Sequence, residues 1–423
     1  MEYLLFILYL TLFAWLVTKV KFFRNAGLSQ TQVIILFLLK IMAGIFYGWI
    51  GTYYGGLAQM YDTWNYHKLS IEEYNLLFSN PQEYLTNLFS NAHKQNLTNF
   101  LGSSGSYWND LKANIFIKLL SVFNIFSFGS YYVNVILYSF ISLFGPIALL
   151  RVMSDVFPGR KLTLVLFTFL IPSFLFWTSG LGKEGILFTG MGMVIYSVYF
   201  GLKENKWGIK RILSIITGLL LILALRNFVL PLVIAAVIVW LIAKQFPGKE
   251  KWVYAISYIL FTILFFNVRY ISPALDFPAA VAGKQKEFLQ IVGASSVPIK
   301  ELEPTAKSFL LNTPQAISLS AIRPFPGDVK HILSLAAAVE INVILLLFIL
   351  FIFFRRNGIL NKAFSLFCIY LSFSILLSIG FSQSNLGAIV RYRSIILPLL
   401  VIPVAALTDW KRINNVIEKY ITK

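Results

Sequence analysis

The sequence predicts an all-α protein that crosses a membrane many times. Of its 423 residues, 58% are hydrophobic and only 13% are charged, whereas about a quarter of the residues in an ordinary soluble domain are charged. The mean hydropathy is +0.74. Apolar residues form long continuous runs, and most basic residues lie in the short connectors between them. We therefore expect a bundle of helices that faces lipid over much of its surface.

About eleven apolar runs are candidate spans, because roughly 17–25 residues rising about 1.5 Å each cover about 30 Å of hydrocarbon. In chain order they are 3–20, 32–50, 130–150, 162–178, 185–202, 211–226, 228–243, 252–268, 332–354, 362–381 and 392–408. The first run lacks the basic start and the small-residue cleavage site of a signal peptide, so we expect a retained span. Residues 1–423 then form a single transmembrane domain.

The basic connectors predict the orientation. Lysine and arginine gather in alternate connectors, near 19–24, 151–161, 203–211, 244–251, 355–362 and 411–423. The positive-inside rule places these connectors in the cytoplasm of a plasma (inner) membrane, with the N-terminus outside and the C-terminus cytoplasmic. A net charge of +18 is then explained by topology, and no motif for nucleic acid is present.

Two long connectors are expected on the outer side. Residues 51–129 form an outer loop, in which Ser70 opens a capping-box pattern for a short helix. The apolar stretch 113–126, preceded by Asp110 as a candidate N-cap, is expected to lie in the membrane interface. If it crossed the membrane, every later basic connector would move outside. Residues 269–330 form a second outer loop, which resembles a lid more than a domain.

Ionisable groups at the outer rim or within spans are the functional candidates, because burying charge in a membrane is costly. Asp62 follows the second span, where a carboxylate can accept a proton from an attacking hydroxyl. A solvated loop acid or an Asx turn explains Asp62 equally well. Trp64 and Tyr66 suit sugar rings or an aromatic belt, and His67 is a secondary candidate.

The turn at residues 179–185 carries a second candidate pair. Lys183 and Glu184 open the following helix, where backbone amides attract anions. A surface pair that caps this helix is the simpler interpretation, but three glycines in the turn would let a ligand approach the backbone. The next candidate, Arg226, lies between two predicted spans, and snorkelling explains it about as well as function does.

Three more arginines, Arg323, Arg391 and Arg393, are expected at the outer ends of spans. Several guanidinium groups on one face indicate an anionic ligand, because the planar fork of arginine donates two parallel hydrogen bonds to phosphate. Glu340, inside a predicted span, is expected to be a counter-ion for one of them. Zinc spacings, nucleophile elbows and dinucleotide fingerprints do not occur in the sequence.

The order of these elements resembles the GT-C superfamily of integral-membrane glycosyltransferases over most of residues 32–408. The resembling features are a span followed by the early acid Asp62, the interfacial segments 70–90 and 111–126, and the late Arg391-Tyr392-Arg393 before Pro398. The sequence departs from that pattern in two ways, because no second acid adjoins Asp62 and an extra span precedes the module.

The resemblance implies transfer of a sugar from a polyprenyl-phosphate donor to a glycan, lipid or protein acceptor on the non-cytoplasmic face. Asp62 would deprotonate the acceptor, and Trp64 and Trp108 would stack on sugar. The leaving phosphate would be stabilised by cations drawn from Lys183, Arg226, Arg323, Arg391 and Arg393. A divalent cation would be an optional cofactor, since cationic side chains serve the same electrostatic role.

Three alternatives stay open. A polysaccharide polymerase or ligase of similar architecture fits the same charges. A transporter or flippase would place ionisable or helix-breaking residues near the midplane, and a structural subunit of a membrane complex is the third alternative. An enzyme should show one outer pocket that joins Asp62 to two or more arginines and opens sideways to lipid, whereas a transporter should show a central path.

Overall fold

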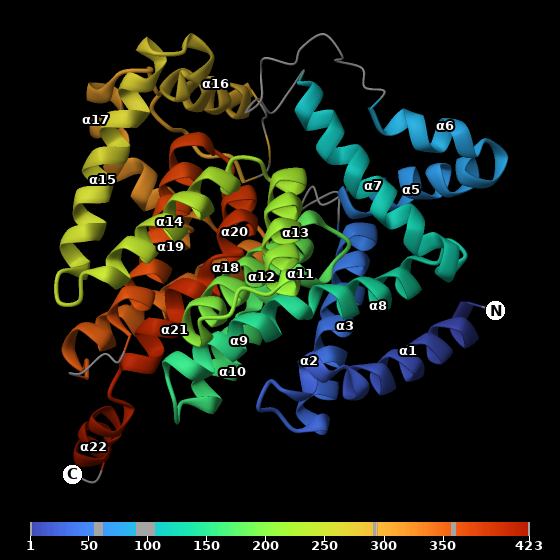
Figure 1. The fold of residues 1–423 in the computed structure, drawn as a ribbon, viewed down its shortest axis with the longest axis horizontal. Coiled ribbons are helices and arrows are strands. Elements are labelled where there is room, and N and C mark those ends of the chain that lie inside the picture. Colours follow the sequence, from blue (N-terminus) through green and yellow to red (C-terminus); the bar gives the residue numbers. More distant parts are fainter. Residues whose placement is uncertain are drawn as a thin grey trace.

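The structure is a computed structural model that describes residues 2–54, 62–89, 106–290, 293, 295–356 and 361–421. Within these ranges the chain forms helices and no strand, which confirms the predicted all-α class. Figure 1 shows the helices α8, α9, α11 and α12 in the middle of the molecule, between α5–α7 on one side and α15–α17 on the other.

Seven helical segments in the described ranges are long and apolar enough to cross a membrane. They are α1 (Glu2–Lys19), α3 (Gln30–Tyr53), α8 (Tyr131–Ser142) together with α9 (Phe144–Val156), α12 (Lys183–Glu204), α15 (Glu250–Asn267) with its 3₁₀ extension to Tyr270, α18 (Ile332–Phe353) and α19 (Lys362–Ser382). Two bent pairs raise the number to nine if each pair counts as one span. The protein is therefore a multi-pass membrane protein by the length and composition of its helices.

Two of the eleven expected spans form helices that are shorter than any of the seven segments counted above. The runs 211–226 and 228–243 form α13 (Ile209–Leu225) and α14 (Val229–Gln245), each of 17 residues. Such a helix rises about 26 Å, slightly less than a typical hydrocarbon core. Because the two helices are consecutive, leaving both out moves no later connector to the other side, and the orientation of the chain stays a prediction.

The bent pairs arise where proline interrupts an apolar run. The run 162–178 divides into α10 (Lys161–Phe169) and α11 (Pro172–Ser179), which meet at 51°. The last run divides into α20 (Leu386–Ser394) and α21 (Leu397–Leu407), which meet at 63°. Proline lacks the N–H of a helical hydrogen bond and disfavours helix in the residue before it. The first break is followed by α11 and the turn at 179–185, and the second break directly follows Arg391 and Arg393.

The described parts of the first long loop form α5 (Asp62–Ser79), α6 (Pro81–Thr86) and α7 (Tyr107–Ser127). The expected helix at 113–126 is present within α7, but the prediction that a helix begins at Ser70 is wrong. Ser70 is buried in the middle of α5, where its hydroxyl donates to the His67 carbonyl and accepts from Asn124 of α7. The hydroxyl thus joins two helices. Residues 55–61, next to Asp62, lie outside the described residues, as do 90–105.

The second long loop contains α16 (Phe277–Gln290) and α17 (Ala306–Ile317), which both pack on α19.

In the first loop, Ser106 is the N-cap of α7, and Asp110 lies in the first turn of this helix. The expectation that Asp110 caps the helix is therefore also wrong. The remaining described elements are α2 (Lys21–Arg24), α22 (Trp410–Ile421) and the short turns Asn87–Phe89, Val268–Tyr270, Pro273–Leu275, Ser318–Ile322 and Pro326–Asp328.

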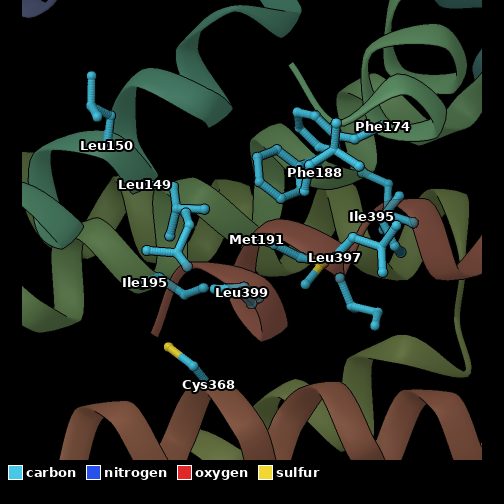
Figure 2. Packing of buried hydrophobic residues seen from close by; sticks show 14 of the residues in the cluster. Leu149, Leu150, Phe174, Phe188, Met191, Ile195, Cys368, Ile395, Leu397 and Leu399 are labelled. Carbon is cyan, nitrogen blue, oxygen red and sulfur yellow. The ribbon is translucent and has the colours of Figure 1, made fainter. Parts of the chain in front are cut away.

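A shared hydrophobic core holds the helices that carry the candidate site. Figure 2 shows Phe174 of α11 and Phe188 of α12 close to Ile395 and Leu397 at the break between α20 and α21. All four side chains are at most 3% exposed. Burying a side chain of this size stabilises a fold by about 1.5–3 kcal/mol. The start of α12 and the end of α20 are therefore fixed relative to each other.

Candidate functional site

Three charged side chains from distant parts of the chain meet at the start of α12. Arg391 of α20 donates to both carboxylate oxygens of Glu184, from Nε at 2.7 Å and from Nη2 at 3.0 Å. The remaining nitrogen of the same guanidinium, Nη1, donates to Asp62 Oδ2 at 2.7 Å. The Glu184 side chain is 1% exposed, whereas that of Asp62 is 59% exposed. Arg391 therefore bridges one buried and one accessible carboxylate.

Arg226 is the second arginine at this carboxylate. Its Nη2 donates to Glu184 Oε1 at 2.8 Å, its Nη1 donates to the Tyr392 hydroxyl at 3.2 Å, and its guanidinium lies over the Tyr392 ring at 4.2 Å. Although burial opposes the charge, Tyr392 and Glu184 raise the pKa of Arg226 above its ordinary value. Arg226 is thus a permanent cation whose position is fixed by Glu184 and Tyr392.

Hydrogen bonds and close packing fix the turn before Glu184. Lys40 of α3 donates to the Thr178 carbonyl at 2.5 Å, and the Tyr138 hydroxyl donates to the Gly182 carbonyl at 2.6 Å. A Cβ at Gly180 would lie 2.1 Å from the Tyr47 ring. The expectation that the glycines of this turn admit a ligand is therefore wrong for Gly180, where the space is filled by the protein itself.

A cavity of about 610 Å³ begins at the Asp62–Arg391 pair, within the range of small-molecule sites. Apolar side chains of α3, α11 and α18 form much of its wall, and the Trp177 ring lies 5.3 Å from the Arg391 guanidinium. Its polar lining includes Asp62, Arg391 and Tyr392, and also Glu340, His331 and Asn385. The expected enzyme pocket would join Asp62 to two or more arginines, but among the described residues Arg391 is the one candidate arginine that lines this cavity. Arg226 contacts Glu184, and neither of these two residues lines the cavity.

Two further candidates lie close to this charged group. The Lys183 side chain is buried, and its Nζ lies 5.3 Å from the centre of the Tyr66 ring. Tyr66 packs edge to face on Phe116 of α7, and burial raises the pKa of its hydroxyl. Lys183 and Tyr66 thus connect the start of α12 to α5 and α7.

Trp64 and His67 pack between helices in the structure, and neither is among the described residues that line the cavity. The Trp64 ring stacks on Tyr131 at 4.1 Å, and its Nε1 donates to the Gly48 carbonyl at 2.8 Å. His67 is 6% exposed and packs edge to face against the same tyrosine. Burial lowers the pKa of His67 to about 4, so its ring is neutral near pH 7. Both side chains join α5 to α3 and α8.

Arg393 lies apart from Arg391, although only one residue separates them. Two residues on a helix are about 200° apart, and Arg393 is 1% exposed and donates to the backbone carbonyls of Arg323 and Ser320. Arg323 itself pairs with Asp328, with nitrogen–oxygen distances of 2.9 and 2.5 Å. The expectation that Arg323 and Arg393 join the phosphate-binding group is thus not met by their positions.

Trp108 and Glu340 are the two remaining candidates. Trp108 packs edge to face on Tyr107 in the first turn of α7 and is not among the described residues that line the cavity. The Glu340 carboxylate accepts hydrogen bonds from the Ser173 amide and hydroxyl, each at 2.6 Å, and forms no ion pair within the described ranges. It caps the first turn of α11, where free amides favour a carboxylate. Its charge also attracts the buried Arg393 without a direct ion pair, which agrees with the expectation that Glu340 is a counter-ion for one of the arginines.

Lys112 and Lys284 are site residues that sequence reasoning missed. Lys112 of α7 donates to the Asn227 side-chain oxygen at 3.2 Å, and Lys284 of α16 lies 4.6 Å from the centre of the Phe228 ring. Burial and then repulsion by nearby cations, Arg226 among them, lower the pKa of Lys112 to about 8 and that of Lys284 to about 7. No local pattern marks them, because their proximity is created only by the tertiary fold.

The arrangement can bind an anion and transfer a proton. Arg391 lies between the accessible Asp62 and the buried Glu184, and Arg226 contacts Glu184. The two carboxylates that could ligate a metal are both paired with Arg391. Within the described residues, no group of three or more His, Cys, Asp or Glu side chains is placed to hold a metal ion. The chain matches no protein family, no curated protein and no solved structure. Its function must therefore be inferred from the geometry of this site.

Proposed function

We propose that this protein is a membrane glycosyltransferase that moves a sugar from a polyprenyl-phosphate donor to an acceptor on the non-cytoplasmic face. The supporting observation is the continuous group Asp62–Arg391–Glu184–Arg226, of which Asp62 and Arg391 line a cavity with mainly apolar walls. An apolar wall suits a lipid chain, and guanidinium groups suit its phosphate.

Glycosyl transfer assigns a different task to each end of this group. A bond forms between the acceptor oxygen and the anomeric carbon, while the bond from that carbon to the phosphate oxygen breaks. The acceptor proton passes to Asp62. The electron pair of the broken bond stays on the lipid phosphate, where Arg391 and Arg226 stabilise the developing charge.

The exposure of the two carboxylates indicates how a donor would enter. Exposed ion pairs contribute about 0–1 kcal/mol, so a phosphate can displace Asp62 from Arg391 Nη1. Glu184 is 1% exposed and accepts hydrogen bonds from both arginines. A phosphate would displace this buried carboxylate far less readily than Asp62. Donor binding would therefore release Asp62 for the acceptor while Glu184 keeps both guanidinium groups in position.

The test is Asp62→Asn expressed in cells that lack the wild-type chain, with Glu72→Gln as the matched control. Glu72 is an exposed acid on the same helix. The proposal predicts that Asp62→Asn accumulates a lipid-linked sugar exposed on the non-cytoplasmic leaflet and loses the glycan product, as measured by mass spectrometry of lipid extracts. Unchanged product in a well-folded variant would reject the proposal. Accumulation on the cytoplasmic leaflet would indicate a flippase instead.

A further inference from the structure

The last described helix, α22, carries its apolar and its basic residues on opposite faces. Successive residues of a helix are about 100° apart, so the apolar residues fall within about one third of its circumference. They are Trp410, Ile413, Val416 and Ile417. The opposite face holds polar residues, which include one acid and three basic residues: Glu418, Lys411, Arg412 and Lys419. α22 is therefore a basic amphipathic helix.

The start of α22 is fixed to the end of α18. The Asp409 amide donates to the Phe354 carbonyl at 2.7 Å, and the Asp409 carboxylate pairs with Arg356 at 3.4 Å. The Arg412 guanidinium lies 5.6 Å from the centre of the Phe354 ring. α18 is long and apolar enough to span a membrane, and its last residue, Phe353, is 71% exposed. α22 therefore begins at the depth at which α18 leaves the hydrocarbon core.

The apolar face of α22 becomes uncovered beyond its first turn. Ile413 is 6% exposed, whereas Val416 and Ile417 are 38% and 48% exposed. Figure 1 shows α22 at one end of the molecule, beyond α21. Because the helix starts at the membrane surface, its uncovered apolar side chains lie where the boundary of the acyl chains can receive them.

The charge of this region indicates which lipids cover the helix. Besides the basic residues of α22 itself, the exposed Arg355 and Arg356 lie beside its start, where Arg355 pairs through its backbone with Thr408. Lysine and arginine at the membrane surface extend their flexible side chains to the headgroups, and a negatively charged leaflet attracts them. The position of α22 at the end of a span favours a lipid surface over an acidic protein groove.

We propose that α22 lies in the membrane interface and binds the headgroups of anionic phospholipids through Lys411, Arg412 and Lys419. Val416 and Ile417 then lie at the boundary of the acyl chains. The expected orientation of the chain places this surface on the cytoplasmic face. This inference concerns the lipid around the protein and does not depend on the reaction at Asp62.

Spin labels on the full chain measure the depth of α22 in nanodiscs of phosphatidylcholine, with or without phosphatidylglycerol. A label at Ile417→Cys should be more accessible to oxygen, which concentrates in lipid, than to a water-soluble nickel chelate. A label at Asn415→Cys, an exposed position on the polar face, is the matched control and should show the reverse. The unmodified chain gives the background, because Cys368 is the one cysteine in the sequence and is buried.

The lysines should determine how the helix responds to the lipid. With phosphatidylglycerol present, Lys411→Gln and Lys419→Gln should each lower the ratio of inserted to free helix by about fivefold, as reported by the label at position 417. Lys419→Arg should preserve this ratio, which separates lost charge from an altered helix. Lys307→Gln, at an exposed position on α17, is the control for charge elsewhere in the chain and should leave the ratio unchanged.

Two results would overturn the inference. A label at position 417 that is equally deep in both membranes would show that α22 does not recognise anionic lipid. A label that stays in water in both membranes would show that lipid does not cover the apolar face, which would then be free for a protein partner.

Discussion

Asp62 and Arg391 are 329 residues apart in the chain, yet Asp62 Oδ2 accepts a hydrogen bond from Arg391 Nη1 at 2.7 Å. This contact joins the start of α5 to α20. The other two nitrogens of Arg391 are held by Glu184, so the geometry of the pair is fixed from the buried side. Asp62 is the accessible member of the pair, and we therefore assign the proton transfer to it.

Asp62→Asn should separate activity from stability. Loss of a positioned general base lowers a rate by about 10²–10⁴-fold, whereas an exposed ion pair contributes about 0.2–1 kcal/mol to folding. Sugar transfer by the purified variant should thus fall by at least 100-fold, and its unfolding temperature should stay close to that of wild type. A variant that loses stability and activity together would indicate a structural role for Asp62.

Glu184→Gln should strongly destabilise the protein. The carboxylate is 1% exposed and accepts from two arginines, and removing one partner from a buried ion pair costs about 3–5 kcal/mol. Thermal unfolding in detergent measures this change, with the exposed Glu301→Gln as the control. If both variants unfold at the same temperature, the two arginines do not depend on Glu184.

Arg391→Lys should change phosphate binding and Arg393→Lys should change stability, because the two side chains lie on different faces of α20. Lysine at position 391 keeps the charge but cannot bridge Glu184 and Asp62, so phosphate binding should weaken by about tenfold. Lysine at 393 loses contacts to two backbone carbonyls and should lower stability by about 1–3 kcal/mol while phosphate binding is retained. Weaker phosphate binding in Arg393→Lys would contradict the assignment.

The free energy of unfolding should fall as the pH is lowered, because His67, a residue outside the membrane-spanning segments, is protonated more readily in the unfolded chain. Burial lowers its pKa to about 4 in the folded chain, compared with about 6.5 in an unfolded one. Between these values the unfolded chain binds the additional proton, so stability falls as the pH drops from about 6.5 to 4, by on the order of 3 kcal/mol. Unfolding temperatures measured from pH 7 to pH 4 should show a smaller decrease in His67→Gln. An equal decrease in both proteins would assign the acid sensitivity elsewhere.

The residues at the centre of the site could be predicted because charge in an apolar sequence is costly. Asp62, Glu184, Arg226 and Arg391 all stand beside apolar runs, where an ionised side chain needs a partner. Their shared contacts could not be predicted, since no spacing in the chain specifies which arginine meets which acid. Lys112 and Lys284 were missed for a related reason, as each lies in a polar segment where a lysine needs no special explanation.

Local patterns failed where tertiary contacts compete with them. The capping-box pattern at Ser70 predicted a helix start, but Ser70 lies inside α5, where its hydroxyl bonds to Asn124 of α7 and does not cap a helix. Trp64 and His67 were assigned to substrate because aromatic and polar groups lie side by side in the sequence. In the folded chain both pack against Tyr131. Helical spacing alone, in contrast, would have separated Arg391 from Arg393.

A cryo-EM structure of the full chain in nanodiscs with a polyprenyl phosphate tests the central claim most directly. We predict density for the lipid phosphate within hydrogen-bond distance of Arg391 and Arg226, with its chain in the apolar cavity and with Asp62 released from Arg391 Nη1. Lipid phosphate bound elsewhere, with the Asp62–Arg391 pair intact, would contradict it.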